Sequence, residues 1–258
     1  MFNPTHCEPA SFSGTAYGTP PPGQGGQGAS SPISTSFDLV GCKGLAFTPK
    51  FSVSTQGKTS KARGASLTST VTYPNAVAGT YANVARVKVD LPKQLPSRLT
   101  TLQKACTNAQ FESNPAGCPA ESKIGYAVVH TPLLPVPLSG PAIFVSHGGE
   151  AFPSLTMVLQ GDNVTIDLVG TTNISKAGIT STTFKTLPDS PFSTFELTLP
   201  EGKYSALAAN GNLCTSKLAS RQNSSPRMAR RSTSPPKSAS RAARRPRRSP
   251  GRRNCRKH

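Results

Sequence analysis

Six cysteines, at positions 7, 42, 106, 118, 214 and 255, are the first residues whose chemistry has to be considered. None of them forms a CxxC pair, and no histidine lies near them at the spacing of a zinc site, so no metal centre is predicted. Their dispersed spacing favours disulfides formed in an oxidising compartment. Cys106 and Cys118 bracket a short segment, and Cys7 and Cys42 bracket a Gly/Pro/Ser-rich one, which makes these two pairs the expected bridges. Cys214 then has only Cys255 as a partner, and six free thiols in a cytosolic protein is the alternative.

The segment Ser-His-Gly-Gly-Glu at 146–150 has the residue types of a hydrolase oxyanion loop. Such a loop works with a nucleophile in a GxSxG elbow, and the chain contains no GxSxG. We could assign no trio of Ser, His and acid. Residues 146–150, which include His147, are therefore interpreted as the end of a strand followed by a glycine turn. The sequence therefore predicts no catalytic residue and no enzyme.

Other polar motifs point to no cofactor. Asp162, Asp167 and Glu150 could ligate calcium, but no DxDxDG-like spacing supports a site, and solvated carboxylates are expected. The stretch GKTSKARG lacks the GxxxxGK[ST] pattern of a phosphate loop and is interpreted as a basic turn.

Positive charge is concentrated at one end of the chain. Residues 1–216 contain 14 Lys/Arg and 11 Asp/Glu, a net charge of +3, whereas residues 217–258 contain 15 Lys/Arg and no acid. A tail of this kind can neutralise nucleic acid or an anionic wall polymer, and it lacks aromatic residues for base stacking. Because a run of charge alone specifies no partner, we expect residues 217–258 to be a disordered, solvated basic tail, with polyanion binding as the alternative. The possible polyanion contacts are Arg230, Arg231, Arg244, Arg245, Arg247, Arg248, Arg252 and Arg253.

Residues 37–216 have the alternating pattern of many short strands separated by Gly/Pro turns. In VARVKVDLP, for example, apolar residues 87, 89 and 91 alternate with charged ones, and FPSLTMVLQ and VTIDLVG alternate in the same way. Gly161-Asp162-Asn163, between the last two runs, predicts a β-hairpin. The expected fold is all-β, with one or two β-sandwich (Ig-like) modules.

One helix is expected near 97–113, in SRLTTLQKACT and the AQF that follows. Ser97 follows Pro96 and is a plausible N-cap, and Leu99, Leu102 and Ala105 would share the buried face.

The ends of the chain differ from its centre. Residues 1–36 are rich in Gly, Pro and Ser, which predicts a loop or linker and the remnant of a preceding module joined through Cys7 to Cys42. No run is apolar and long enough to span a membrane. The start lacks the basic and apolar regions of a signal peptide, so a secreted protein would have lost its signal upstream of Met1.

Long collinear stretches covering about residues 37–218 resemble a known family. They are FTPKFSVSTQGKTSKARGASLTSTVTYP, VKVDLPKQLPSRLTTLQKACTNAQFESNPAGCPAESKIG, PLSGPAIFVSHGGEAFPSLTMVLQGDNVTIDLVG, STTFKTLPDSPFSTFELTLPEG and SALAANGNLC. In them the chain resembles secreted β-rich surface proteins of high-G+C bacteria that have no assigned function. The resemblance implies an extracellular β-rich module with paired cysteines, and it implies no catalytic residue.

The sequence departs from that family after Leu218-Ala219, where further strand and another cysteine would follow. Permitted codons for SRQNSSPRMARRSTSPPKSASRAARRP, read two nucleotides on, yield TEFVAQNGAEINKSTQIGVTGCPPPK. This string is strand-like and places a cysteine across the codons of Ala242 and Ala243, where it could pair with Cys214. We therefore expect a reading-frame error near Ser220.

Taken together, these observations predict a non-catalytic structural or adhesive module of a secreted or cell-surface protein. Its partner would be a cell-wall polymer, a glycan or another protein. The alternative function is polyanion binding through residues 217–258, with nucleic acid as a partner only if the basic tail is genuine.

Overall fold

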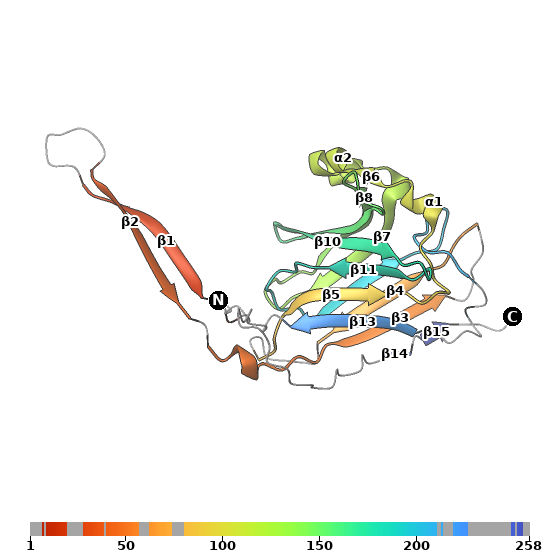
Figure 1. Cartoon of the computed structure of the whole chain (residues 1–258), viewed down its shortest axis with the longest axis horizontal. Coiled ribbons are helices and arrows are strands. Elements are labelled where there is room, and N and C mark those ends of the chain that lie inside the picture. Colours follow the sequence, from red (N-terminus) through yellow and green to blue (C-terminus); the bar gives the residue numbers. More distant parts are fainter. Residues whose placement is uncertain are drawn as a thin grey trace.

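The computed structural model describes residues 7, 9–19, 28–38, 40–56, 62–73, 80–210, 213, 219–226, 249–250 and 252–254. Over these residues the chain is all-β, as expected. One curled sheet forms the body, and a separate hairpin projects from this body (Figure 1). None of the described helices is long and apolar enough to cross a membrane.

The body sheet has the strand order β14-β13-β5-β11-β10-β9-β8-β7-β12-β4-β3-β15, and short β6 pairs with β8 outside this path. Neighbouring strands are antiparallel except in the pairs β15–β3 and β6–β8. Because β14, at one end of the order, also contacts β3 near the other end, the sheet is a nearly closed, barrel-like sandwich. The strands are β3 (Lys50–Gln56), β4 (Leu67–Thr72), β5 (Val84–Asp90), β6 (Cys106–Thr107), β7 (Lys123–His130), β8 (Leu138–Ser146), β9 (Ser154–Gly161), β10 (Val164–Ile174), β11 (Thr180–Phe184), β12 (Thr194–Leu199), β13 (Ala219–Pro226), β14 (Ser249–Pro250) and β15 (Arg252–Asn254).

The hairpin expected at residues 161–163 is confirmed. β9 and β10 are antiparallel with Gly161 opposite Val164, so Asp162 and Asn163 are the two central residues of the turn. Both have positive φ, 50° and 59°, which is the backbone of a type I′ turn. Asp and Asn adopt this conformation more readily than most residues, which explains their presence here.

The alternation of strand residues separates two clusters of buried side chains. On β8, Ala142 and Phe144 face the main core inside the curled sheet. Ile143 and Val145 face outward and are fully buried in a smaller cluster with Cys106 and Cys118. The segment that holds these cysteines therefore covers the outer face of β8, and it lies at the top of the body in Figure 1.

The prediction of a single helix near 97–113 is wrong in detail. The structure has two short helices, α1 (Leu99–Leu102) and α2 (Asn108–Ser113), with β6 between them. The chain leaves the helix because Cys106 is fully buried and pairs with β8 opposite Val145. The second helix then begins at a capping box between Thr107 and Gln110.

The cap expected for the first helix is also wrong, and the expected buried face is wrong at Leu99, whereas Leu102 and Ala105 pack in or against the core. Arg98, not Ser97, is its N-cap, and no side chain caps it. The Ser97 N–H instead donates a hydrogen bond to Thr180 Oγ1. Leu102 is buried, but Leu99 is 61% exposed because a four-residue helix has no full apolar stripe.

Both ends of the chain contain strands that the sequence analysis missed. Residues expected as a loop form strands β1 (Ala10–Tyr17) and β2 (Ser30–Phe37). Residues 219–226, expected to be disordered, form β13 along the edge of β5. An unpaired edge of β5 would leave backbone N–H and C=O groups without partners, and this pairing satisfies them.

Both expected disulfides, Cys7–Cys42 and Cys106–Cys118, are present. The second closes a loop of 12 residues over the outer face of β8, and the first joins residues 35 positions apart. Cys214 and Cys255 lie outside the described residues.

We predict that Gly140→Ala destabilises the body by roughly 1–3 kcal/mol, because a Cβ on β8 at this position would collide with the backbone carbonyl of Val158 on β9. Urea unfolding followed by circular dichroism measures the change. Gly117→Ala is the matched control, since its Cβ would meet no atom closer than 3.9 Å. Equal stabilities of the two variants would contradict the prediction.

Candidate functional site

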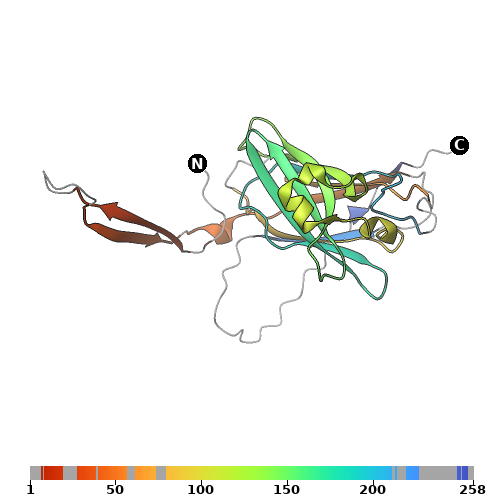
Figure 2. The same ribbon diagram turned by 90° about the horizontal axis from the view of Figure 1, so that it is seen from above.

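The hairpin of β1 and β2 forms an arm that projects from the body, and the two views agree on this (Figures 1 and 2). Its strands pair over eight positions, from Ala10 opposite Phe37 to Tyr17 opposite Ser30. Cys7 precedes the arm and Cys42 follows it, so their disulfide ties the two ends of the hairpin together at its foot. We call residues 10–37 the arm.

The arm has one apolar face and one polar face. In an antiparallel pair, directly opposed residues lie on the same face. Phe12 pairs with Thr35, Gly14 with Ile33 and Ala10 with Phe37, so Phe12, Ile33 and Phe37 share one face. The other face is formed by serines and threonines at positions 11, 13, 15, 34 and 36, together with Pro32, Tyr17 and Ser30.

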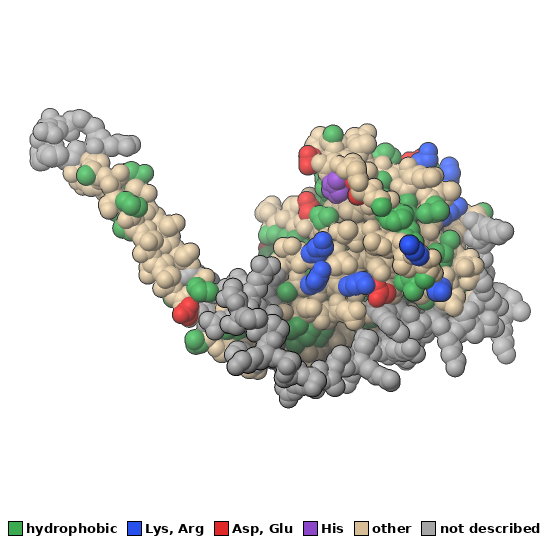
Figure 3. All heavy atoms as spheres, in the orientation of Figure 1, with side chains coloured by type: hydrophobic (Ala, Val, Ile, Leu, Met, Phe, Trp, Pro, Cys, Tyr) green, Lys and Arg blue, Asp and Glu red, His purple; other side chains and the backbone are tan. Residues whose placement is uncertain are grey.

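The apolar side chains of the arm are exposed to solvent. Phe12 is 63% exposed, Ile33 58% and Phe37 46%, and Figure 3 shows hydrophobic side chains along the arm, away from the body. The Phe12 and Phe37 rings stack on each other with centroids 5.7 Å apart. This is the alternation of a strand pair that covers a core, but among the described residues nothing of the body covers it.

The arm also lacks charge. No Asp, Glu, Lys or Arg occurs between Ala10 and Phe37. A single two-stranded hairpin is marginally stable in water, and exposed strand edges readily pair with another chain. The arm therefore exposes an uncharged face that is apolar at Phe12, Ile33 and Phe37.

A second cluster of interest surrounds His147, which comes directly after β8. Its Nε2 lies 2.9 Å from Ser154 Oγ, and its Nδ1 lies 2.7 Å from Asn108 Oδ1 on α2. Asn108 Nδ2 in turn donates a hydrogen bond of 2.7 Å to Glu112 Oε1. The structure thus brings together a Ser, a His and an amide that are up to 46 residues apart in the sequence, with an acid one step further away.

The buried position of Ser154 argues against nucleophilic chemistry in this cluster. Ser154 is 6% exposed, and its hydroxyl donates a hydrogen bond to the Val145 carbonyl and lies 3.2 Å from Thr156 Oγ1. A serine nucleophile has to reach a substrate carbonyl. The cluster instead links α2 to the turn between β8 and β9.

The same turn holds a carboxylate with a perturbed pKa. The His147 backbone N–H donates a hydrogen bond of 2.8 Å to Glu150 Oε1. The pKa of Glu150 is lowered below its usual value, chiefly by its own backbone N–H, then by Ser146 and to a smaller extent by His147. The ionised carboxylate therefore holds this exposed turn closed.

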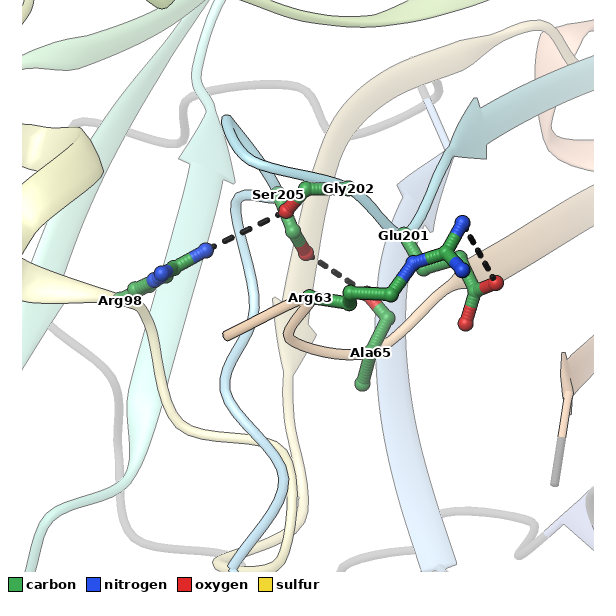
Figure 4. Close-up of polar contacts among 6 residues, drawn as sticks. All are labelled: Arg63, Ala65, Arg98, Glu201, Gly202 and Ser205. Atoms are coloured by element: carbon green, nitrogen blue, oxygen red, sulfur yellow. Dashed lines mark hydrogen bonds and ion pairs between the residues drawn. The ribbon is translucent and has the colours of Figure 1, made fainter. Parts of the chain in front are cut away.

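Arg98, the N-cap residue of α1, joins its own loop to two others, and Figure 4 shows its contact with Gly202. Its Nη1 donates to the carbonyls of Gly202 and Lys203, and its Nη2 donates to that of Ala62. Nearby, Arg63 and Glu201 form an exposed ion pair of 3.7 Å. A guanidinium whose donors are occupied by backbone carbonyls acts as a structural clamp rather than a ligand site.

Beneath this clamp, Ser205 is buried and its hydroxyl bridges two carbonyls. It lies 2.9 Å from the Ala65 carbonyl and 3.0 Å from that of Leu207, and the Thr101 hydroxyl donates to the Ser205 carbonyl. These buried polar groups satisfy one another, so they fix the loops and leave no donor for a ligand.

The described residues contain no group of three or more His, Cys, Asp or Glu that could hold a metal ion. Of the arginines proposed to contact a polyanion, only Arg252 and Arg253 belong to the described backbone, in β15. The others, Arg230, Arg231, Arg244, Arg245, Arg247 and Arg248, lie outside the described residues. The arm was not predicted from the sequence, although the alternation around Phe12 and the bracketing cysteines were signals for it.

In comparisons with known proteins, no family model, no curated protein and no solved structure matches this chain.

We predict that the turn at 147–150 opens in acid, below the usual pKa of glutamate. A carboxylate whose pKa is lowered by folding stabilises the folded turn above pH 4.5, and this stabilisation is lost as the pH falls through the lowered pKa. The backbone amide signals of His147 and Glu150 in two-dimensional NMR should titrate with a midpoint below 4.5. In Glu150→Gln this titration should be absent. A midpoint at or above 4.5 in the unmodified chain would contradict the assignment.

Proposed function

We propose that this chain is a non-catalytic structural or adhesive module of a secreted or cell-surface protein, and that it associates with a second copy of itself through the apolar face of its arm. The observation that carries this proposal is the exposure of Phe12, Ile33 and Phe37 on one face of a projecting hairpin. Two disulfides support an oxidising, extracellular setting.

The physical argument starts from the cost of leaving this face in water. Complete burial of one Phe or Ile side chain stabilises a complex by about 1.5–3 kcal/mol before the costs of association. Three such side chains on one flat face are enough to drive weak, specific contact. A second arm offers the same flat, apolar and uncharged face, and two such faces can pack about 10 Å apart as in a β-sandwich.

Symmetry favours a second copy as the partner. In a two-fold contact the same patch meets itself, so a patch without charge meets no repulsion from its copy. An anionic wall polymer or nucleic acid would be attracted by positive charge, and the arm has none. A glycan would require hydrogen-bonding side chains on the contact face, and those of the arm lie mostly on the opposite face.

Sedimentation velocity tests the proposal directly. We expect the chain to form dimers at about 100 µM, and the dimers to persist in about 1 M salt because no charges carry the contact. The double variant Phe12→Ser, Phe37→Ser should be monomeric under the same conditions. The matched control, Ser13→Ala with Ser36→Ala on the other face, should still dimerise.

Two results would overturn this assignment. One is a monomeric wild-type chain at this concentration, and the other is a dimer that survives the Phe12→Ser, Phe37→Ser change. Dissociation in high salt would instead assign self-association to charged residues, which the arm lacks.

The non-catalytic part of the proposal has its own test. Because Ser154 is buried and its hydroxyl donates to the Val145 carbonyl, a fluorophosphonate probe should not label the folded chain. Intact-mass spectrometry detects such labelling. A covalent adduct that forms on the wild-type chain and is lost in Ser154→Ala would establish a serine nucleophile and refute the proposal.

A further inference from the structure

The curled sheet encloses a cavity of about 150 Å³. Its walls come from nearly every strand of the body and from the segment 187–192, which precedes β12. Apolar side chains dominate the lining, among them Phe51, Met157, Ile166, Phe184 and Phe195. Among the described residues that line it, none is Asp, Glu, Lys, Arg or His.

This space is larger than packing defects usually are. Protein interiors pack as densely as organic crystals, and voids larger than one water molecule are few. An apolar cavity of about this size stays dry and accepts a benzene-sized molecule. Met157 and Leu159 are almost fully buried, whereas Val87, Ile166 and Phe195 on other walls are half-buried, so the cavity has a closed floor and an accessible side.

One polar group in the lining has no partner. Gln222, on β13, lines the cavity, and its Nε2 is buried without a hydrogen-bond partner among the described residues. A buried amide N–H without an acceptor costs free energy, and an acceptor supplied from inside the cavity would relieve that cost. The cavity therefore combines an apolar volume with one unsatisfied donor, which is the usual composition of a small-molecule site.

We propose that this cavity binds a small, uncharged, mostly apolar molecule of about six to nine carbon atoms that has one hydrogen-bond acceptor, such as a ketone. The apolar walls hold the hydrocarbon part, and Gln222 Nε2 donates to the acceptor. The described lining offers no charged side chain, so phosphates, carboxylates and ammonium compounds would lose their hydration there without gaining an ion pair from it. This site is separate from the arm.

Acetophenone and α-methylstyrene test the proposal, because they have nearly the same shape and differ in the carbonyl oxygen. The probe is the ¹³C-labelled methyl group of Met157, which lies in the cavity wall. Both compounds should shift this signal, and acetophenone should bind about 2- to 10-fold more tightly, the range expected for one neutral hydrogen bond. Each should also raise the thermal unfolding midpoint as its concentration increases.

Substitutions then separate the two features of the site. Gln222→Leu should remove the preference for acetophenone while α-methylstyrene still binds. Val87→Phe should fill the cavity and abolish binding of both compounds. The control is the same substitution at Val169, which is 47% exposed and does not line the cavity, and it should leave both affinities unchanged.

The wild-type chain alone can overturn the proposal, whether or not any variant folds. Failure of both compounds to shift the Met157 signal up to their solubility limits would show that the cavity takes no ligand of this class. Equal affinities for the two compounds would show that Gln222 donates no hydrogen bond into it.

Discussion

The body depends on close contact between backbones at glycines inside its strands. A Cβ at Gly125 on β7 would collide with the Thr198 carbonyl, and one at Gly140 on β8 would collide with that of Val158. On β10, Gly170 makes room for the Phe184 ring. Glycines within strands are typical of tight bends at the corners of barrels, and three of them on β7, β8 and β10 allow the sheet to curl until β14 contacts β3. The cavity exists because the curled walls face each other at a distance that their side chains do not fill.

Much of the body could be predicted from the sequence because its signals are local. The run from β7 to β12 has alternating apolar residues, and Asp162-Asn163 has the composition of a type I′ turn. The disulfides could be inferred because each joins cysteines that bracket one segment. These features depend on neighbours in the sequence, so the sequence of this one chain was enough to predict them.

The features that the sequence did not predict depend on distant contacts or were hidden by composition. The alternation around Phe12 and Ile33 lies within a segment so rich in Gly, Pro and Ser that it predicted a linker. The expected helix is divided because Cys106 pairs with β8, 39 residues further along the chain. The contact between His147 and Asn108 likewise requires the segment that holds α2 to fold over β8. The cavity could not be predicted, because it requires the side chains of most strands at once.

The predicted reading-frame error bears on one part of the cavity only. Gln222 lies two residues beyond Ser220, near which the error is expected, whereas the other residues of the lining lie between 51 and 197. The string from the other frame begins TEFVA, which is also strand-forming and would also suit the edge of β5. A change of frame would therefore replace the amide and leave the apolar walls in place. The cavity's preference for a ligand with a hydrogen-bond acceptor therefore depends on the reading frame near Ser220. Its ability to hold a hydrocarbon does not.

The distribution of charge explains why whole-chain properties are a poor guide to recognition here. The net charge of +18 comes mostly from residues 217–258, while the arm and the described residues of the cavity lining contain no charge. The partners proposed for both surfaces would be held by apolar contact, which salt does not screen. The strongly basic composition suggests a nucleic-acid or polymer binder, yet the two surfaces proposed as binding sites would favour uncharged partners. Any salt dependence of binding must therefore come from charged residues elsewhere in the chain.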